Sequence, residues 1–322
     1  MTSTHPRIDP ELAPVLSAVH QQLSPTIAPE DIEALRANPV FSVADDVLRR
    51  DGTIDLEHLS VPGPPGAPQI PLLVLRPAAQ GPEAPIFYHI HGGGMIIGNH
   101  RTGVDTVLDW AVDSGAVVVS VEYRLAPENP DPAPIEDCYA GLLWTHEHAA
   151  EIQGDPDRIV VVGTSAGGGL AAGVSLLARD RGGPRLLGQL LMCPMLDDRF
   201  ITPSSQELHG DGIWDATSNT TGWNALLGER RGGDDVSIYA APARATDLTG
   251  LPPAFIDVGS VETFRDEDID YAARLLQAGV PCELHVWPGG FHGFVGMAPD
   301  ASLSQSASST RGAWVRRLLA AG

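Results

Sequence analysis

In VVVGTSAGGGLAAG, residues 160–173, a run of valines leads through a small-residue turn into a helix-like stretch. A buried strand, a tight turn and a small-residue helix form the context of the G-x-S-x-G nucleophile elbow. The neighbours of the nucleophile must be small there, and Gly163, Ala166 and Gly167 meet that requirement around Ser165. The pentapeptide alone also occurs by chance as a glycine-rich turn. The flanking strand and helix favour a nucleophile at Ser165.

A second glycine-rich loop, HIHGGGMIIG at residues 89–98, follows the apolar run APIFYHI. Glycines at the end of a buried strand let backbone N–H groups approach an acyl oxygen without interference from Cβ atoms. The expected oxyanion donors are Gly93 and Gly94, joined by Ala166 behind the nucleophile. A phosphate-binding loop is the alternative, but neither G-K-[ST] nor G-x-G-x-x-G accompanies it. The residues that support the two motifs are His91, Gly92, Gly163 and Gly167.

A general base is expected at His292, within GGFHGF at residues 289–294. This loop directly follows the last apolar run, and open α/β sheets bind their ligands at the carboxyl ends of the strands. Other histidines have simpler interpretations: His146 and His148 read as surface residues of a helix, and His285 lies within a strand.

The acid that orients the base is the least obvious member of the site. A triad acid should lie in the loop that leaves the preceding strand, where it can accept a hydrogen bond from the second imidazole nitrogen. Glu262 fits that position and is preferred over its rivals. Asp266, Glu267 and Asp268 read as the start of the next helix, and Asp257 as a buried strand end. The chain order Ser165, Glu262, His292 is that of nucleophile-elbow hydrolases.

Short apolar runs alternate with helix-like stretches from about residue 53 onward. This alternation predicts a mostly parallel sheet covered by helices on both faces. The seven predicted strands are 69–77, 84–92, 115–123, 157–165, 186–194, 252–260 and 280–288. The predicted helices between them are 101–115, 133–152, 166–180 and 265–279, the last with Gly279 as its C-cap.

Two segments depart from this alternation of strands and helices. Residues 1–50 show helical apolar spacing, and an insertion at about 200–240 is polar and loop-rich but carries Trp214 and Trp223. Long insertions between strands are usually disordered or part of an active-site cover, and tryptophans argue against disorder. We therefore expect residues 1–50 and the insertion to form a cap on a catalytic domain that spans 51–322.

Composition indicates a globular protein with a sizeable core: 322 residues, 43% apolar and 19% charged. The net charge of −21 opposes binding to nucleic acid and to anionic membranes. Three scattered cysteines fit neither a disulfide framework nor a metal cluster. No apolar stretch is long enough to span a membrane, and the N-terminus does not read as a signal peptide. A cytoplasmic location without metal or cofactor is expected.

Several motifs, taken together and in their order along the chain, resemble those of the hormone-sensitive-lipase-like esterases, also called bacterial family IV, which have the α/β-hydrolase fold. The resemblance runs from about residue 70 to the C-terminus, and stretches 235–253 and 275–285 are similar to members of the heroin-esterase and acetyl-esterase type. It implies an eight-stranded, mostly parallel sheet, a small helical cap, no metal, and hydrolysis of short to medium acyl esters. The motifs are HGGG (91–94), YRLAPE (123–128), GTSAGG (163–168), RDE (265–267) and FHGF (291–294).

The chain departs from the family pattern at two positions. Thr164 stands where many members have Asp, which indicates the GTSAG subgroup, and Glu262 aligns with the catalytic aspartate. YRLAPE reads as a structural turn held by Arg124 and Glu128. The resemblance also suggests a homodimer that pairs through the sheet edge at the last strand.

The resulting expectation is a serine carboxylesterase acting on a small-molecule ester. The same nucleophile, base and acid would also suit the hydrolysis of amides, carbamates or lactones. A lipase that acts at an oil–water interface is disfavoured by the acidic, polar surface. A non-catalytic small-molecule receptor is disfavoured because both nucleophile and base are present.

Overall fold

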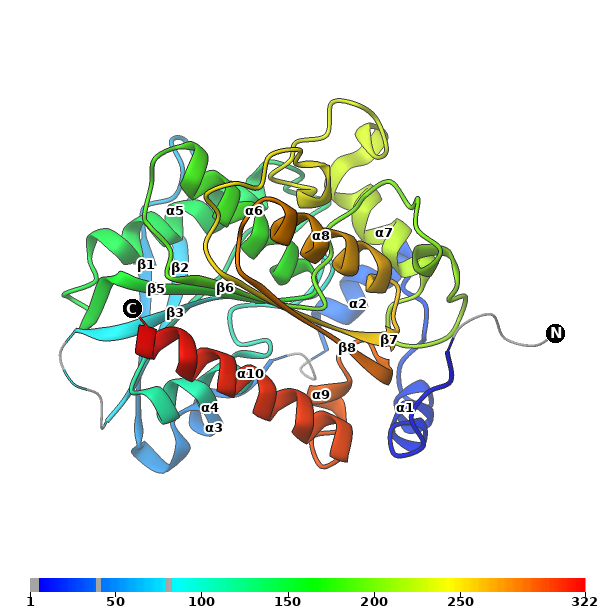
Figure 1. The fold of residues 1–322 in the computed structure, drawn as a ribbon, viewed down its shortest axis with the longest axis horizontal. Helices are drawn as coiled ribbons and strands as arrows, with labels where there is room; N and C mark the ends of the chain where they lie inside the picture. Colours follow the sequence, from blue (N-terminus) through cyan, green and yellow to red (C-terminus); the bar gives the residue numbers. More distant parts are fainter. Residues whose placement is uncertain (1–5, 39–41, 79–80, 82, 322) are drawn as a thin grey trace.

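The fold is a central sheet between two layers of helices (Figure 1). The computed structural model describes residues 6–38, 42–78, 81 and 83–321. Helices α5, α6 and α8 (Ala133–Glu147, Ala166–Asp180, Arg265–Gln277) cover one face, and α4 and α10 (Val104–Ser114, Ser302–Ala321) cover the other. The remaining α-helices are α1 (Ala13–His20), α2 (Ile32–Arg36), α3 (Asp45–Leu48), α7 (Ala216–Leu227) and α9 (Phe294–Met297).

Eight strands form one sheet in the order β1-β2-β4-β3-β5-β6-β7-β8. The strands β1 and β2 are antiparallel to each other, β2 is antiparallel to β4, and all later pairs are parallel. The carboxyl ends of the parallel strands therefore meet at one edge of the sheet. The strands are β1 (Ile54–Val61), β2 (Ile70–Pro77), β3 (Ala84–Ile90), β4 (Val117–Val121), β5 (Gly154–Thr164), β6 (Gly188–Met192), β7 (Ala254–Val261) and β8 (Cys282–Phe291).

Each central strand buries side chains on both faces, because alternate residues of a strand point to opposite sides of the sheet. In β5, Ile159 and Val161 join the core under α5 and α6, whereas Val160 and Val162 join the core under α4 and α10. This explains why the strands read as continuous apolar runs in the sequence.

The predicted architecture is confirmed, but the strand β1 and the helices α7, α9 and α10 were not among the predicted elements. All seven predicted strands are present, as are the four helices predicted between them. Gly279 adopts the expected positive φ of 78° after α8. The missed strand β1 alternates buried and exposed residues at the antiparallel edge, so it lacks a continuous apolar run. The missed helix α10 contains many serines and alanines and shows only weak apolar spacing.

Residues of the N-terminal segment and of the 200–240 insertion are in contact. Thr26 Oγ1 donates to Asp215 Oδ2 at 2.7 Å, and the N–H of Ile27 donates to Ser218 Oγ at 2.9 Å. Trp214 and Trp223 are 4% and 0% exposed, as expected for an ordered insertion.

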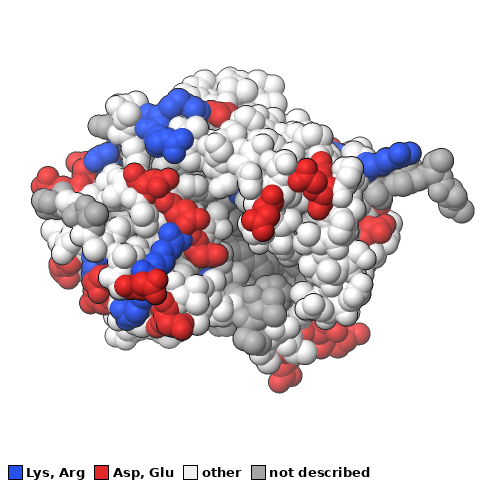
Figure 2. All heavy atoms as spheres, turned by 90° about the horizontal axis from the view of Figure 1, so that it is seen from below, with Lys and Arg blue, Asp and Glu red and all other residues white. Residues whose placement is uncertain are grey.

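The edge strand β8 borders only β7, and pairing of two copies through it stays a prediction. Among the described residues, no helix is both long enough and apolar enough to cross a membrane. Acidic side chains flank a hollow on the face shown in Figure 2.

Candidate active site

Ser165 occupies a sharp turn between β5 and α6, with φ 59° and ψ −125°. Its N–H donates to the carbonyl of Met192 at 2.8 Å, which ties the turn to the neighbouring strand. A Cβ atom on Gly167 would come within 2.1 Å of the carbonyl oxygen of Ile90, so only glycine fits there. A non-glycine residue held at positive φ by tight surroundings is the strained geometry expected of a nucleophile elbow.

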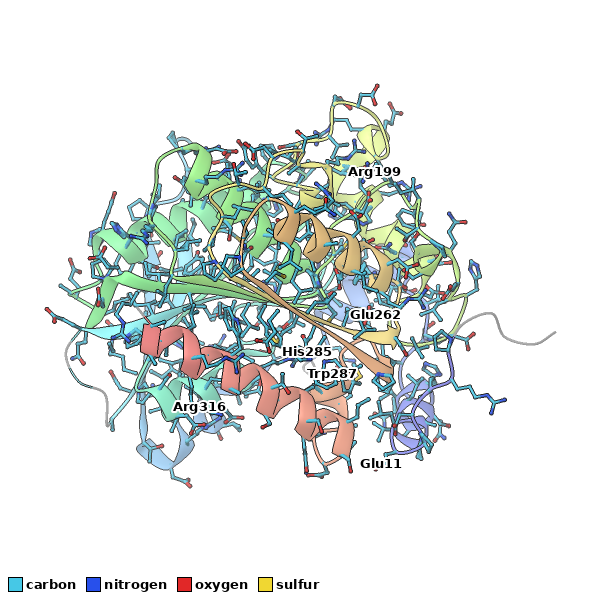
Figure 3. All side chains as sticks on the ribbon, viewed as in Figure 1. Glu11, Arg199, Glu262, His285, Trp287 and Arg316 are labelled. Carbon is cyan, nitrogen blue, oxygen red and sulfur yellow. The ribbon has the colours of Figure 1, made fainter. Side chains whose placement is uncertain are left out.

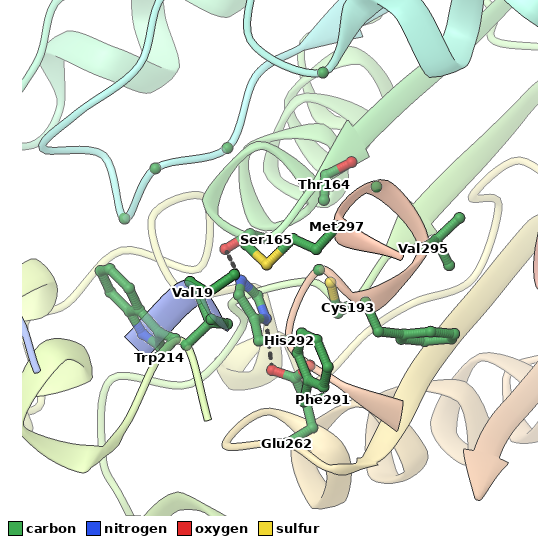
Figure 4. Close-up of a pocket in the computed structure, with 18 of the residues that line it drawn as sticks. Val19, Thr164, Ser165, Cys193, Trp214, Glu262, Phe291, His292, Val295 and Met297 are labelled. Atoms are coloured by element: carbon green, nitrogen blue, oxygen red, sulfur yellow. Dashed lines mark hydrogen bonds and ion pairs between the residues drawn. The ribbon is translucent and has the colours of Figure 1, made fainter. Parts of the chain in front are cut away.

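His292 lies between Ser165 and Glu262 (Figure 4). Its Nε2 is 3.0 Å from Ser165 Oγ, and its Nδ1 is 2.6 Å from Glu262 Oε1. An ionised carboxylate only accepts hydrogen bonds, so Nδ1 carries the proton and donates to Glu262. Nε2 is then free to accept the hydrogen bond from the Ser165 hydroxyl.

Glu262 directly follows β7, and its side chain is 1% exposed. The carboxylate therefore reaches His292 from the neighbouring strand end, as the chain order suggested. Burial is the largest single effect and lowers the pKa of His292, but the charges and hydrogen bonds of Glu262 and Cys193 together outweigh it and raise this pKa well above its usual value of 6.5.

The four rival carboxylates are bonded or buried elsewhere. Asp257 lies inside β7 and pairs with Arg311. The other three lie in the first turn of α8, as predicted. Asp266 accepts from Arg265 and from the N–H of Ser204, Glu267 accepts from the N–H groups of Leu196 and Asp197, and Asp268 is fully buried.

The glycine loop lies against the nucleophile elbow. A Cβ atom on Gly92 would be 2.9 Å from the carbonyl oxygen of Thr164 and 3.4 Å from Cβ of Ser165. Gly93 and Gly94 have φ values of 113° and 60°, and the carbonyl of Gly93 accepts from the N–H groups of Ile96 and Ile97. Gly93 and Gly94 thus lie in a tight turn directly after Gly92, and both line the same cavity as Ser165.

Ala166 and His91 complete this part of the site. Ala166 is the first residue of α6, and the first N–H groups of a helix have no partner within the helix. The Nδ1–H of His91 donates to the carbonyl of Gly92 at 2.8 Å, and the ring stacks on Tyr123. Burial lowers the pKa of His91 to about 4, so the ring is neutral and keeps the peptide after Gly92 in place.

YRLAPE is a structural turn whose two charged residues have separate partners. The guanidinium and the backbone N–H of Arg124 form three hydrogen bonds with the buried carboxylate of Asp137, and Glu128 pairs with Arg36 of α2. Both lie outside the lining of the cavity described next.

A cavity of about 450 Å³ surrounds Ser165. Its lining includes Val19 of α1 and Trp214 of the insertion. Trp214 packs so closely on the glycine loop that a Cβ atom on Gly94 would come within 2.1 Å of the indole ring. In the sequence, Trp214 indicates only an ordered insertion, and no local pattern predicts this contact.

Cys193 is a further residue that the sequence analysis missed, since it was read only as one of three scattered cysteines. Among the described residues, its Sγ, a carboxylate oxygen of Glu262 and a ring nitrogen of His292 form a group in which all ligand atoms lie within 4.8 Å. Both ring nitrogens of His292 already bind Ser165 and Glu262, so a metal ion there would have to displace one of these bonds. The expected absence of metals and cofactors stays a prediction.

The chain is similar to known esterases over most of its length. A family model described as the alpha/beta hydrolase fold matches residues 87–296. Esterase LipI of Mycobacterium tuberculosis is 37% identical, with 91% of this chain and 89% of that protein covered. Carboxylesterase NlhH of the same organism is 39% identical, with 85% and 92% covered. The solved structure of a bacterial heroin esterase superposes with a TM-score of 0.87 at 40% identity, covering 98% and 99%.

Proposed function

Because the chain belongs to the hormone-sensitive-lipase-like group of the α/β-hydrolase fold family and is a carboxylic ester hydrolase, we propose that it cleaves short to medium acyl esters through Ser165, His292 and Glu262. The observation that carries this proposal is the continuous chain of hydrogen bonds from Ser165 Oγ through the imidazole to Glu262 Oε1. The names of the relatives, which are esterases and a carboxylesterase, support an ester substrate.

In the acylation step, Ser165 Oγ bonds to the ester carbonyl carbon while His292 Nε2 takes the hydroxyl proton. The carbonyl oxygen becomes an oxyanion. The imidazolium is stabilised by Glu262 and then donates its proton to the leaving alcohol oxygen as the C–O bond breaks.

The oxyanion is held by the N–H groups of Gly93, Gly94 and Ala166. All three belong to backbone that is fixed before the reaction, so they stabilise the developing charge without reorganisation. One such donor typically contributes about 3–4 kcal/mol to transition-state stabilisation.

In the deacylation step, water replaces the alcohol. His292 takes a proton from this water, the resulting oxygen attacks the acyl carbon, and the proton returns to Ser165 Oγ as the acid leaves.

The N-terminal helices and the 200–240 insertion form the small cap of this enzyme. The hydrogen bonds from Thr26 to Asp215 and from Ile27 to Ser218 support this assignment, as does the position of Val19 and Trp214 at the cavity. The cap then restricts the size of the acyl and alcohol groups that the cavity accepts.

Hydrolysis of p-nitrophenyl esters from acetate to decanoate tests the acyl preference. We expect kcat/KM to be highest for short and medium chains and to fall steeply toward decanoate, because Val19 and Trp214 of the cap border the cavity and limit the length of acyl chain that fits beside the aryl group. A rate that stays constant or rises to decanoate would contradict the proposal. Absence of turnover on every ester would direct attention to amides and carbamates.

The pH dependence tests the role of His292. Only the neutral imidazole can accept the serine proton, so kcat/KM should rise with pH through the pKa of His292. The Glu262 carboxylate raises this pKa, so the midpoint should lie above 6.5, the usual value of histidine. Initial rates between pH 5 and 10 with a short-chain ester measure it, corrected for spontaneous hydrolysis. A midpoint below 6.5 would show that Glu262 does not control the base.

A further inference from the structure

The cavity around Ser165 has two parts that lie on opposite sides of the nucleophile. Figure 4 shows Val19 and Trp214 on one side of Ser165, and Thr164 and Val295 on the other. We call the first the outer part and the second the inner part. The lining of the outer part includes exposed residues such as Gln22 and Ser24, so this part opens to solvent.

The inner part lies along the carboxyl ends of three adjacent strands. In the sheet register, Thr164 of β5 pairs with Met192 of β6, and Met192 pairs with Asp257 of β7. Paired residues point to the same face, and Met192 belongs to the core under α4 and α10. Thr164, Met192 and Asp257 therefore form a row on one face of the sheet. The row starts next to Ser165 and crosses two strand spacings, about 10 Å.

Arg311 of α10 closes the far end of this row. Its Nε and Nη2 donate to the two oxygens of Asp257 at 2.8 and 3.0 Å, and Trp287 Nε1 donates to the same carboxylate at 2.9 Å. Figure 3 shows Trp287 beside α10. The side chains of Arg311 and Asp257 are 7% and 0% exposed, yet both residues line the cavity.

The guanidinium of Arg311 keeps donors for a ligand. A guanidinium carries five N–H groups, and the two hydrogen bonds to Asp257 use two of them. A ligand that covers these N–H groups without accepting from them loses their hydrogen bonds to water, so an acceptor oxygen placed here is favoured over an apolar group. Because Asp257 balances the positive charge, and the whole chain carries a net charge of −21, a neutral acceptor suits this end better than a carboxylate.

The order of the two chemical steps assigns the inner part to the acyl chain. The alcohol must leave while the acyl group is still bonded to Ser165. The inner part ends at the buried Arg311–Asp257 pair, so an alcohol there would lie behind the acyl-enzyme, whereas an alcohol in the outer part can escape to solvent. The inner part therefore receives the acyl chain.

From this arrangement we propose that the enzyme selects esters whose acyl chain carries a neutral hydrogen-bond acceptor, such as a ketone or hydroxyl oxygen, several carbons beyond the ester carbonyl. Arg311 is the specificity-determining residue that binds this oxygen, and Asp257 positions it. The inference deepens the proposed function and rests on it.

The first test uses the wild-type enzyme alone. We compare kcat/KM for p-nitrophenyl esters of 4-oxopentanoate, 5-oxohexanoate, 6-oxoheptanoate and 7-oxooctanoate with the alkanoates of equal length, each corrected for its spontaneous hydrolysis rate. A hydrogen bond to a charged donor predicts at least about a tenfold preference for one ketone position. Equal or slower hydrolysis of every ketone overturns the inference and leaves the proposed function intact. Absence of turnover on all esters overturns both.

The second test removes the ion pair without leaving a buried charge. The double variant Asp257→Leu/Arg311→Met replaces it by apolar side chains of similar size, an exchange that buried ion pairs often tolerate. The ketone preference should fall to about one, while alkanoates are still hydrolysed. The matched control is Asp198→Leu/Arg244→Met, a buried pair outside the cavity lining, which should keep the wild-type preference. An unchanged preference in the Asp257/Arg311 variant overturns the assignment.

Discussion

Replacing Ser165 by alanine is expected to lower kcat for p-nitrophenyl acetate by about 10⁶-fold, as removal of the nucleophile does in other serine hydrolases. The reason is that no other hydroxyl occupies the position 3.0 Å from His292 Nε2 in the described part of the chain. Residual rate over water should remain, because the oxyanion donors and the cavity are unchanged. Single-turnover assays measure the loss and show whether an acyl-enzyme forms.

The folded state should tolerate this substitution. Alanine has the same backbone preferences as serine at positive φ, and the hydroxyl contributes only the bond to His292. The melting temperature should therefore change little. Ser175→Ala is the matched control: this hydroxyl is also buried and lies on α6, but it donates to the carbonyl of Ala171, away from the site. Activity of Ser165→Ala within tenfold of wild type would refute a nucleophilic role.

The second large effect is expected at Glu262. Glu262→Gln keeps the shape of the side chain but removes the charge that orients and stabilises the imidazolium, and a comparable change in a serine protease lowers kcat by about 10⁴-fold. Without this charge, the pKa of His292 should fall because burial then dominates. The variant should thus combine a low kcat with a pH midpoint below that of the wild type. Stopped assays over the same pH range measure both.

Asp266→Asn separates this assignment from its nearest rival. Asp266 accepts hydrogen bonds from Arg265 and from the N–H of Ser204, so its loss should lower the melting temperature modestly and leave kcat within tenfold. An inactive Asp266→Asn together with an active Glu262→Gln would move the triad acid to Asp266.

Local patterns predicted most of the fold and the candidates for the site. Strand β5 and helix α6 could be read from the sequence because valine runs and small-residue helices are local signals, and Ser165 stands at their junction. His292 was predicted in the same way, from its place after the last strand. The edge strand β1 was missed because alternating, half-exposed strands give a weak signal.

Neighbouring residues in the chain therefore suffice to predict the class of fold, the nucleophile candidate and a short set of acid candidates. The partners of the two acids follow from the fold alone: Glu262 bonds to His292 and Asp257 to Arg311, although Asp257 lies within β7 and Glu262 directly follows it. The fold also places the indole ring of Trp214 against Gly94. The physical reason is that such contacts join residues far apart in the chain, and their distances are set by how helices pack on the sheet.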